Sequence, residues 1–168
     1  MQDKDTANTL SVSGNKSLLQ GTHTHDEHMY AFPWQNQLEG HNIQQRILVV
    51  EDDPTLATLE AEILTAHGYI VAVVHDGELA IAIIHNFIPD LVVLDFELPG
   101  ALNGWDVLQL LRSYSAIPVL FTTSSITAVR KYIRSRGETR FTLDHLPKPY
   151  PMQTLLKRVK RMLMVTSQ

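Results

Sequence analysis

The chain has 168 residues, of which 44% are apolar, so it is long enough for one domain with a buried core and an additional tail. It contains no cysteine, which excludes disulfide bonds and thiolate metal sites. No apolar run approaches the roughly 20 residues needed to cross a bilayer, and the first residues lack the pattern of a signal peptide. We therefore expect a cytoplasmic protein without membrane contacts.

The net charge of −4 combines two regions of opposite sign. From Val129 onward the chain has ten basic and two acidic residues, whereas the preceding part has four basic and sixteen acidic residues. This division predicts an acidic functional region and a basic surface near the C-terminus.

Residues 1–45 are polar and show neither a strand nor a helix period, which predicts a disordered tail. The tail includes a cluster of His23, His25 and His28 that could bind a transition metal. Loose histidine clusters are common in such tails, so we assign no metal site to it. The folded domain is expected over residues 46–168.

From Arg46 onward, short apolar runs alternate with amphipathic segments. Strands are expected at 47–50, 70–74, 91–94, 118–121 and 141–146. Helices are expected to begin at Pro54, near residue 78, after Asn103, near residue 126 and near Pro151. Five strands that alternate with five helices predict right-handed βαβ units and a parallel sheet covered on both faces.

Three of the helices have apolar residues at helical spacing. The buried sides are predicted to contain Leu56, Leu59 and Ile63 in the first helix, Val107, Leu108, Leu110 and Leu111 in the third, and Leu155, Leu156, Val159, Met162 and Leu163 in the last.

Polar residues gather where four of the five strands end. Ligand sites in parallel sheets lie at the carboxyl ends of the strands, so these residues are expected to meet in one crevice. Asp53 is instead expected to cap the first helix, and Thr122 to be structural. The residues predicted to share the crevice are Glu51, Asp52, Asp95, Thr123 and Lys148.

The chemistry of this group favours phosphoryl transfer. Only oxygen ligands are available, which suits Mg²⁺ better than Zn²⁺. A free carboxylate beside such an ion can attack phosphorus and form an acyl phosphate. The Thr123 hydroxyl could then donate a hydrogen bond to the phosphoryl oxygens, and the Lys148 ammonium could offer them a positive charge.

Four segments resemble the receiver domains of two-component response regulators, in order and at that family's spacing. They are ILVVEDDP at 47–54, PDLVVLDFELPG at 89–100, IPVLFTTS at 117–124 and LPKP at 146–149. The resemblance covers about 120 residues. It implies a flavodoxin-like (βα)5 fold, a doubly wound parallel sheet with strand order 2-1-3-4-5.

The resemblance also implies a role for each site residue. Asp95 would be the phosphorylated aspartate. Glu51, Asp52 and the backbone carbonyl of Glu97 would bind Mg²⁺. The switch and counter-charge residues would be Thr123, His145 and Lys148, and the Lys148–Pro149 peptide bond would be cis. We also expect the Glu97 carboxylate to slow hydrolysis of the acyl phosphate by repelling the attacking water.

The resulting expectation is a single-domain response regulator of a two-component phosphorelay. A sensor histidine kinase or phosphotransfer protein would donate the phosphoryl group, and a downstream protein would bind the basic face formed by the fourth helix, fifth strand and fifth helix. We expect no direct DNA binding and no independent substrate turnover, only self-phosphorylation and self-dephosphorylation. The alternatives are a catalytically silent receiver that acts as a binding module and a phosphatase of the dehalogenase type.

Overall fold

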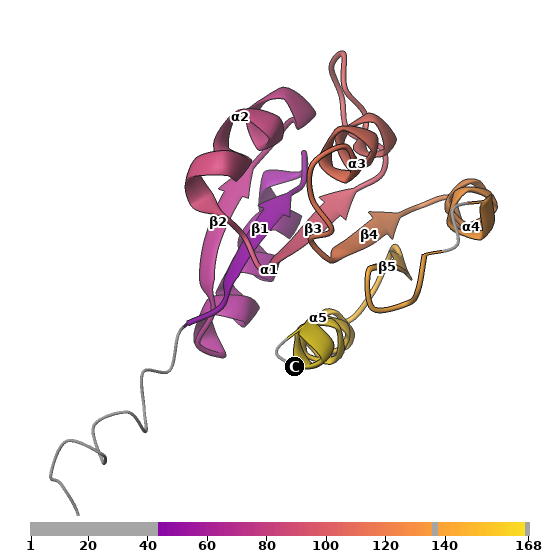
Figure 1. Cartoon of the computed structure of the whole chain (residues 1–168). Coiled ribbons are helices and arrows are strands. Elements are labelled where there is room, and N and C mark those ends of the chain that lie inside the picture. The colour runs from indigo at the N-terminus through magenta and orange to yellow at the C-terminus, as the bar shows by residue number, and fades with distance from the viewer. Residues whose placement is uncertain (1–43, 136–137, 167–168) are drawn as a thin grey trace, which may run out of the picture. The chain divides into compact units, whose positions relative to one another are not determined.

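The computed structural model describes residues 44–135 and 138–166, where five strands alternate with five helices (Figure 1). The polar segment 1–43, including its histidine cluster, lies outside the described residues. The strands are β1 (Arg46–Val50), β2 (Ile70–Val74), β3 (Leu91–Asp95), β4 (Val119–Thr123) and β5 (Leu143–Pro147). The helices are α1 (Pro54–Ala66), α2 (Gly77–Phe87), α3 (Gly104–Arg112), α4 (Ile126–Ser135) and α5 (Met152–Thr166).

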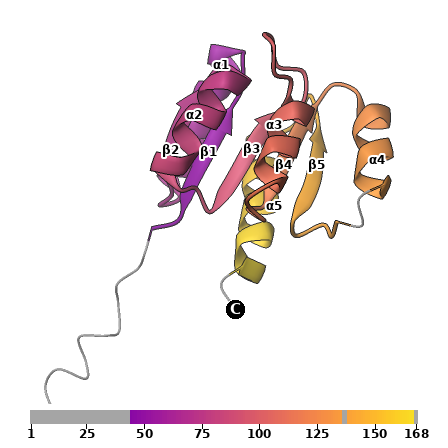
Figure 2. The same cartoon turned by 45° about the horizontal axis from the view of Figure 1, so that its top comes forward.

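The strands form one parallel sheet in the order β2-β1-β3-β4-β5, as predicted. Helices α1 and α5 pack on one face of this sheet, and α2, α3 and α4 lie on the other (Figures 1 and 2). The predicted doubly wound, flavodoxin-like arrangement is therefore confirmed.

The two faces of the sheet bury two separate apolar clusters. Along β1, Ile47 and Val49 point into the cluster under α1 and α5, whereas Leu48 and Val50 point into the cluster under α2 and α3. All four side chains are fully buried. A strand that is covered on both faces must be apolar at every position, which explains the continuous run that marks β1 in the sequence.

Side-chain caps fix the starts of three helices near the carboxyl edge of the sheet. Asp53 accepts a hydrogen bond of 2.8 Å from the Thr55 amide at the start of α1. Asp76 caps α2, and Asn103 forms a capping box with Asp106 at the start of α3. These caps satisfy amides that a helix terminus leaves without partners. The predicted capping role of Asp53 and the predicted start of a helix after Asn103 are confirmed.

Three details of the predicted elements are wrong. Strand β4 runs to Thr123, so both threonines lie inside the strand rather than after it. Helix α1 buries Ala57, Glu60 and Leu64, while Leu59 is 46% exposed. Leu110 of α3 is also exposed. The apolar residues of α1 predicted the wrong buried face, because the face that packs on the sheet includes a small residue, Ala57, and a carboxylate, Glu60.

The Lys148–Pro149 peptide bond is cis, as the family resemblance implied. Within residues 44–135 and 138–166, no helix is both long and apolar enough to cross a membrane.

Candidate functional site

The register of the sheet brings the predicted site residues together. Val50 pairs with Leu94, so Glu51 and Asp95 follow at adjacent strand ends. Asp95 is in register with Thr122 of β4. On the next strand, the Lys148 amide donates a 2.8 Å hydrogen bond to the Thr123 carbonyl. Parallel strands that end at the same edge thus hold two acids, a hydroxyl and a lysine in one crevice.

Three carboxylates form the acidic part of this crevice. Ligand oxygens of Glu51, Asp52 and Asp95 all lie within 4.8 Å of one another. Glu51 and Asp95 are buried, with exposed fractions of 1% and 2%, whereas Asp52 is exposed. A cluster of oxygen ligands that is open to solvent on one side fits Mg²⁺, which keeps several waters when bound. The metal role of the Glu97 backbone carbonyl remains a prediction.

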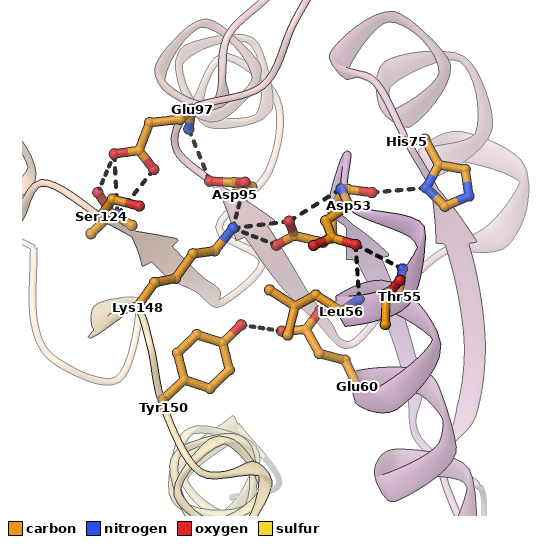
Figure 3. Close-up of polar contacts among 12 residues, drawn as sticks. Asp53, Thr55, Leu56, Glu60, His75, Asp95, Glu97, Ser124, Lys148 and Tyr150 are labelled. Carbon is orange, nitrogen blue, oxygen red and sulfur yellow. Dashed lines mark hydrogen bonds and ion pairs between the residues drawn. The ribbon is translucent and has the colours of Figure 1, made fainter.

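Lys148 lies at the centre of the polar contacts, as Figure 3 shows. Its Nζ atom is 2.6 Å from Asp95 Oδ2 and 2.9 Å from Glu51 Oε1. Burial alone would lower the pKa of the Lys148 ammonium, but its bonds to Asp95 and Glu51 outweigh burial and raise this pKa. The lysine therefore stays charged and balances the two buried acids.

Glu51 differs from an ordinary carboxylate. Burial raises its pKa to about 7, although the hydrogen bond from Lys148 acts in the opposite direction. The neighbouring charge of Asp95 raises this pKa further. A cation beside Glu51 would favour its ionised form, so cation binding and proton release are expected to be coupled here.

The side chain of Glu97 reaches the end of β4. Its carboxylate accepts a 2.8 Å hydrogen bond from the Thr123 hydroxyl and 3.2 Å bonds from the Ser124 and Ser125 amides. The Glu97 amide in turn donates to Asp95 Oδ1 at 2.9 Å. From the sequence, we expect this carboxylate to slow hydrolysis of the acyl phosphate, which stays a prediction. The structure adds direct bonds to the Thr123 hydroxyl and to the amides that precede α4.

A second acidic group, which the sequence did not identify, lies behind the crevice. Glu60 of α1 is fully buried and accepts a hydrogen bond from the Tyr150 hydroxyl (Figure 3). Burial raises the pKa of Glu60 to about 7. Burial, followed by the charge of Glu60, raises the pKa of Tyr150 above its ordinary value. The bond connects α1 to the segment that follows Lys148. In the sequence, a carboxylate on the inward face of α1 was the only signal that could have indicated this contact.

Replacing Glu60 by Gln is expected to remove a pH dependence of stability. The ordinary pKa of this carboxyl is 4.5 and its folded value is about 7, so the folded state binds more protons between these values. The free energy of unfolding of the wild type should therefore fall by about 1–3 kcal/mol, relative to Glu60→Gln, as pH rises through this window. Urea unfolding near pH 4.5 and above pH 7 measures the change. An equal difference between the two proteins at both pH values would contradict it.

Three other sequence candidates contribute no ligand oxygen to the acidic cluster. Asp53 is a helix cap, and bonds from the Thr55 and Leu56 amides lower its pKa. Thr122 is fully buried, and its carbonyl accepts the Phe96 amide. His145 is half-buried on β5 and lines a hollow of about 360 Å³ together with Arg130, Ile133, Arg140, Leu143 and Asp144. The structure therefore does not bring His145 to the acidic cluster, and its switch role stays a prediction.

The basic residues of α4 and α5 flank β5. Asp144 of β5 is buried and forms ion pairs with Arg158 and Arg161 of α5. Arg130 and Lys131 of α4 and Lys157 and Lys160 of α5 are exposed. The buried Asp144 carboxylate thus neutralises part of the predicted basic surface. The exposed lysines and arginine remain accessible to a partner.

Comparisons with known proteins agree with this arrangement. Residues 47–160 match the family model described as the response regulator receiver domain. The chain is 37% identical over 118 residues to the DNA-binding response regulator MtrA of Mycolicibacterium smegmatis, an alignment that covers 70% of this chain and 50% of MtrA. It is 34% identical over 117 residues to the sensory transduction protein RegX3 of Mycobacterium bovis, with the same coverage. The chain thus spans about half the length of these relatives.

Solved structures give the same result. The receiver domain of the Francisella response regulator 1452 superposes with a TM-score of 0.64 at 25% identity, covering 73% of this chain and 99% of that one. The BeF3-activated receiver domain of Klebsiella pneumoniae RstA superposes with a TM-score of 0.62 at 32% identity, covering 71% and 98%. The match to the family model, the strand order and the acidic crevice together establish that the chain belongs to the response regulator receiver domain family.

Proposed function

We propose that this receiver domain accepts a phosphoryl group on Asp95 and signals through a surface that responds to this modification. One observation carries the proposal: Asp95 is buried at the end of β3, yet it lies 2.6 Å from the Lys148 ammonium and beside two further carboxylates. A buried aspartate that serves only to end a strand does not require this surrounding charge.

The chemical step is a transfer between two proteins. A carboxylate oxygen of Asp95 attacks phosphorus, and a P–O bond forms as the P–N bond of a phosphohistidine breaks. The electron pair leaves with the imidazole nitrogen, and the histidine returns to its unphosphorylated form. This chemistry suits a sensor histidine kinase or a phosphotransfer protein as the donor.

The surrounding residues support the transfer in distinct ways. After the transfer, the Lys148 ammonium would stabilise the negative charge of the new phosphoryl oxygens in place of that of the Asp95 carboxylate. Thr123 would donate its hydroxyl to one of these oxygens. Glu51, Asp52 and the Glu97 carbonyl would hold Mg²⁺, which supplies charge neutralisation when bound.

The output is proposed to use the basic face of α4, β5 and α5. Thr123 ends β4, and the Ser125 amide, which follows it at the start of α4, donates to the Thr123 hydroxyl at 2.9 Å. A change at Thr123 would therefore reach α4 directly and shift an existing equilibrium of this face. Exposed lysines and arginines there favour a downstream protein with an acidic surface.

Direct DNA binding by this domain is not part of the proposal. The relative MtrA is named a DNA-binding response regulator, but the alignment covers only half of its length. In the described part of this chain, every helix belongs to the receiver fold. DNA binding by the whole protein is therefore a separate question from the chemistry of Asp95.

Radiolabelled acetyl phosphate, a small phosphoryl donor, tests the proposal without knowledge of the kinase. The wild type is expected to take up label in Mg²⁺ and to take up at least about 100-fold less when a chelator removes the ion, because several acids would then repel the donor. Both reactions are run at matched ionic strength, which controls for salt effects. Absence of labelling in Mg²⁺ would instead favour the catalytically silent receiver.

A further inference from the structure

The Glu97 carboxylate occupies donors that a phosphoryl group on Asp95 would need. The Thr123 hydroxyl donates to Glu97 Oε1 at 2.8 Å, and the Ser124 amide is 3.2 Å from both carboxylate oxygens. The Ser125 amide, which also donates to the Thr123 hydroxyl at 2.9 Å, adds a fourth contact to Glu97 Oε1 at 3.2 Å. Hydrogen bonds to an ionised acceptor are roughly twice as strong as neutral ones, so this is a substantial set of contacts.

The same backbone places Glu97 close to the reacting carboxylate. Its amide donates to Asp95 Oδ1 at 2.9 Å, so the two acids are joined through a two-residue turn. Figure 3 shows the Glu97 side chain extending from this turn toward Ser124, on the side of Asp95 away from His75. An anion attached to Asp95 and the anion of Glu97 would therefore be directed at one set of donors.

We propose that Glu97 is an internal anionic competitor that holds the phosphoryl-binding donors of Thr123, Ser124 and Ser125 until the phosphoryl group displaces it. The inference rests on the proposed phosphorylation of Asp95. It differs from the expected effect of Glu97 on hydrolysis, because competition for donors acts before any water attacks.

Displacement of Glu97 would also change the start of α4. Ser124 and Ser125 directly precede this helix, whose first residue is Ile126. A carboxylate at this point stabilises the amides and the positive end of the helix. A phosphoryl group attached to Asp95 that binds the same amides would carry more negative charge than the Glu97 carboxylate. It would approach these amides from β3 rather than from the Glu97 turn. The exchange thus gives a physical path from the site to the basic face.

Charge repulsion alone is the competing explanation. Removing any acid near Asp95 favours the arrival of an anion, whether or not the acid occupies the donors. Glu78 provides a matched control, since its exposed carboxylate accepts the Ala101 amide at 2.8 Å in the loop that follows Asp95. No described hydrogen bond joins Glu78 to Thr123, Ser124 or Ser125.

Beryllofluoride, which binds carboxylates as a phosphoryl analogue, is the probe for a double-mutant cycle in Mg²⁺. Glu97→Ala is expected to lower the concentration for half-saturation by about 10-fold, because charge-assisted bonds no longer compete. In the Thr123→Val background, Glu97→Ala is expected to lower this concentration by about 3-fold or less. The Thr123 hydroxyl, one of the donors for which the two anions compete, is then absent. Glu78→Gln should change binding by less than about 2-fold in both backgrounds.

Equal factors for Glu97→Ala in the two backgrounds would overturn the competition and leave repulsion as the explanation. Failure of every variant, including the wild type, to bind beryllofluoride would overturn the proposed function and this inference together. Binding by all variants with additive effects would overturn the inference alone. Circular dichroism of each variant verifies that the fold is retained.

Amide NMR of the metal-free protein gives a second readout that does not depend on Thr123→Val. Bonds to a carboxylate shift amide protons downfield, so the Ser124 resonance is expected to move upfield in Glu97→Ala and to stay in place in Glu78→Gln. An unchanged Ser124 resonance in Glu97→Ala would contradict the proposal, because this donor would then not have been held by Glu97.

Discussion

Replacing Asp95 by Asn is expected to reduce phosphoryl uptake by about 1,000-fold or more, because the amide retains the shape of the side chain but lacks its nucleophilic oxygen. Glu51 and Asp52 are not expected to substitute for it, because the proposal assigns both carboxylates to Mg²⁺. The measurement is label incorporation from acetyl phosphate in Mg²⁺, with the wild type in parallel.

Folding of the Asp95→Asn variant provides the control. Asp95 raises the pKa of Glu51 through like-charge repulsion, so removing its charge relieves part of this repulsion. Lys148 retains Glu51 as a partner 2.9 Å away. The midpoint of thermal unfolding is therefore expected not to fall. Label incorporation by the folded variant at the wild-type rate would show that another residue accepts the phosphoryl group.

Replacing Gly104 by Ala is expected to have the largest effect on the geometry of the site. A Cβ atom at this position would lie 2.1 Å from the Asp95 carbonyl oxygen and 2.8 Å from the Phe96 Cα atom. Both are backbone atoms, so no side-chain rotation relieves the overlap. We expect a loss of about 3 kcal/mol in the free energy of unfolding. Phosphorylation should slow by about 100-fold, since the turn that holds Asp95 must move.

Gly68→Ala is the matched control for this prediction. Gly68 has a φ of +88°, but a Cβ atom there would meet nothing within 4 Å. We expect a loss of about 1 kcal/mol from the left-handed backbone alone and no change in phosphorylation rate, because Gly68 precedes β2, at the strand end opposite the site. Similar phosphorylation rates for Gly104→Ala and Gly68→Ala would contradict the close-packing explanation.

Much of the fold could be predicted because its central strands β1, β3 and β4 are buried on both faces. The runs at Ile47–Val50 and Leu91–Leu94 are apolar at every position, and each ends abruptly at an acid. The fifth strand, Leu143–Pro147, contains Asp144 and His145 and is only weakly patterned. Its charged residue is buried because α5 supplies two arginines, and this compensation cannot be read from the strand itself.

The site could be predicted in part for a related reason. Residues at the ends of parallel strands converge by topology alone, so Asp95 and Lys148 could be placed together without coordinates. Contacts that depend on a side-chain direction could not. The Glu97 carboxylate turns toward Thr123, and Glu60 of α1 meets Tyr150 across 90 residues of sequence. Neither direction is encoded in a local pattern.

Locating the phosphoryl group tests the proposed role of Asp95 most directly. The intact wild type would be treated with acetyl phosphate and Mg²⁺, digested under acidic conditions that preserve acyl phosphates, and analysed by tandem mass spectrometry. We expect one phosphoryl group on Asp95, which hydroxylamine removes and which is absent when a chelator replaces Mg²⁺. A phosphoryl group on any other residue, or a stoichiometry near zero in Mg²⁺, would contradict it.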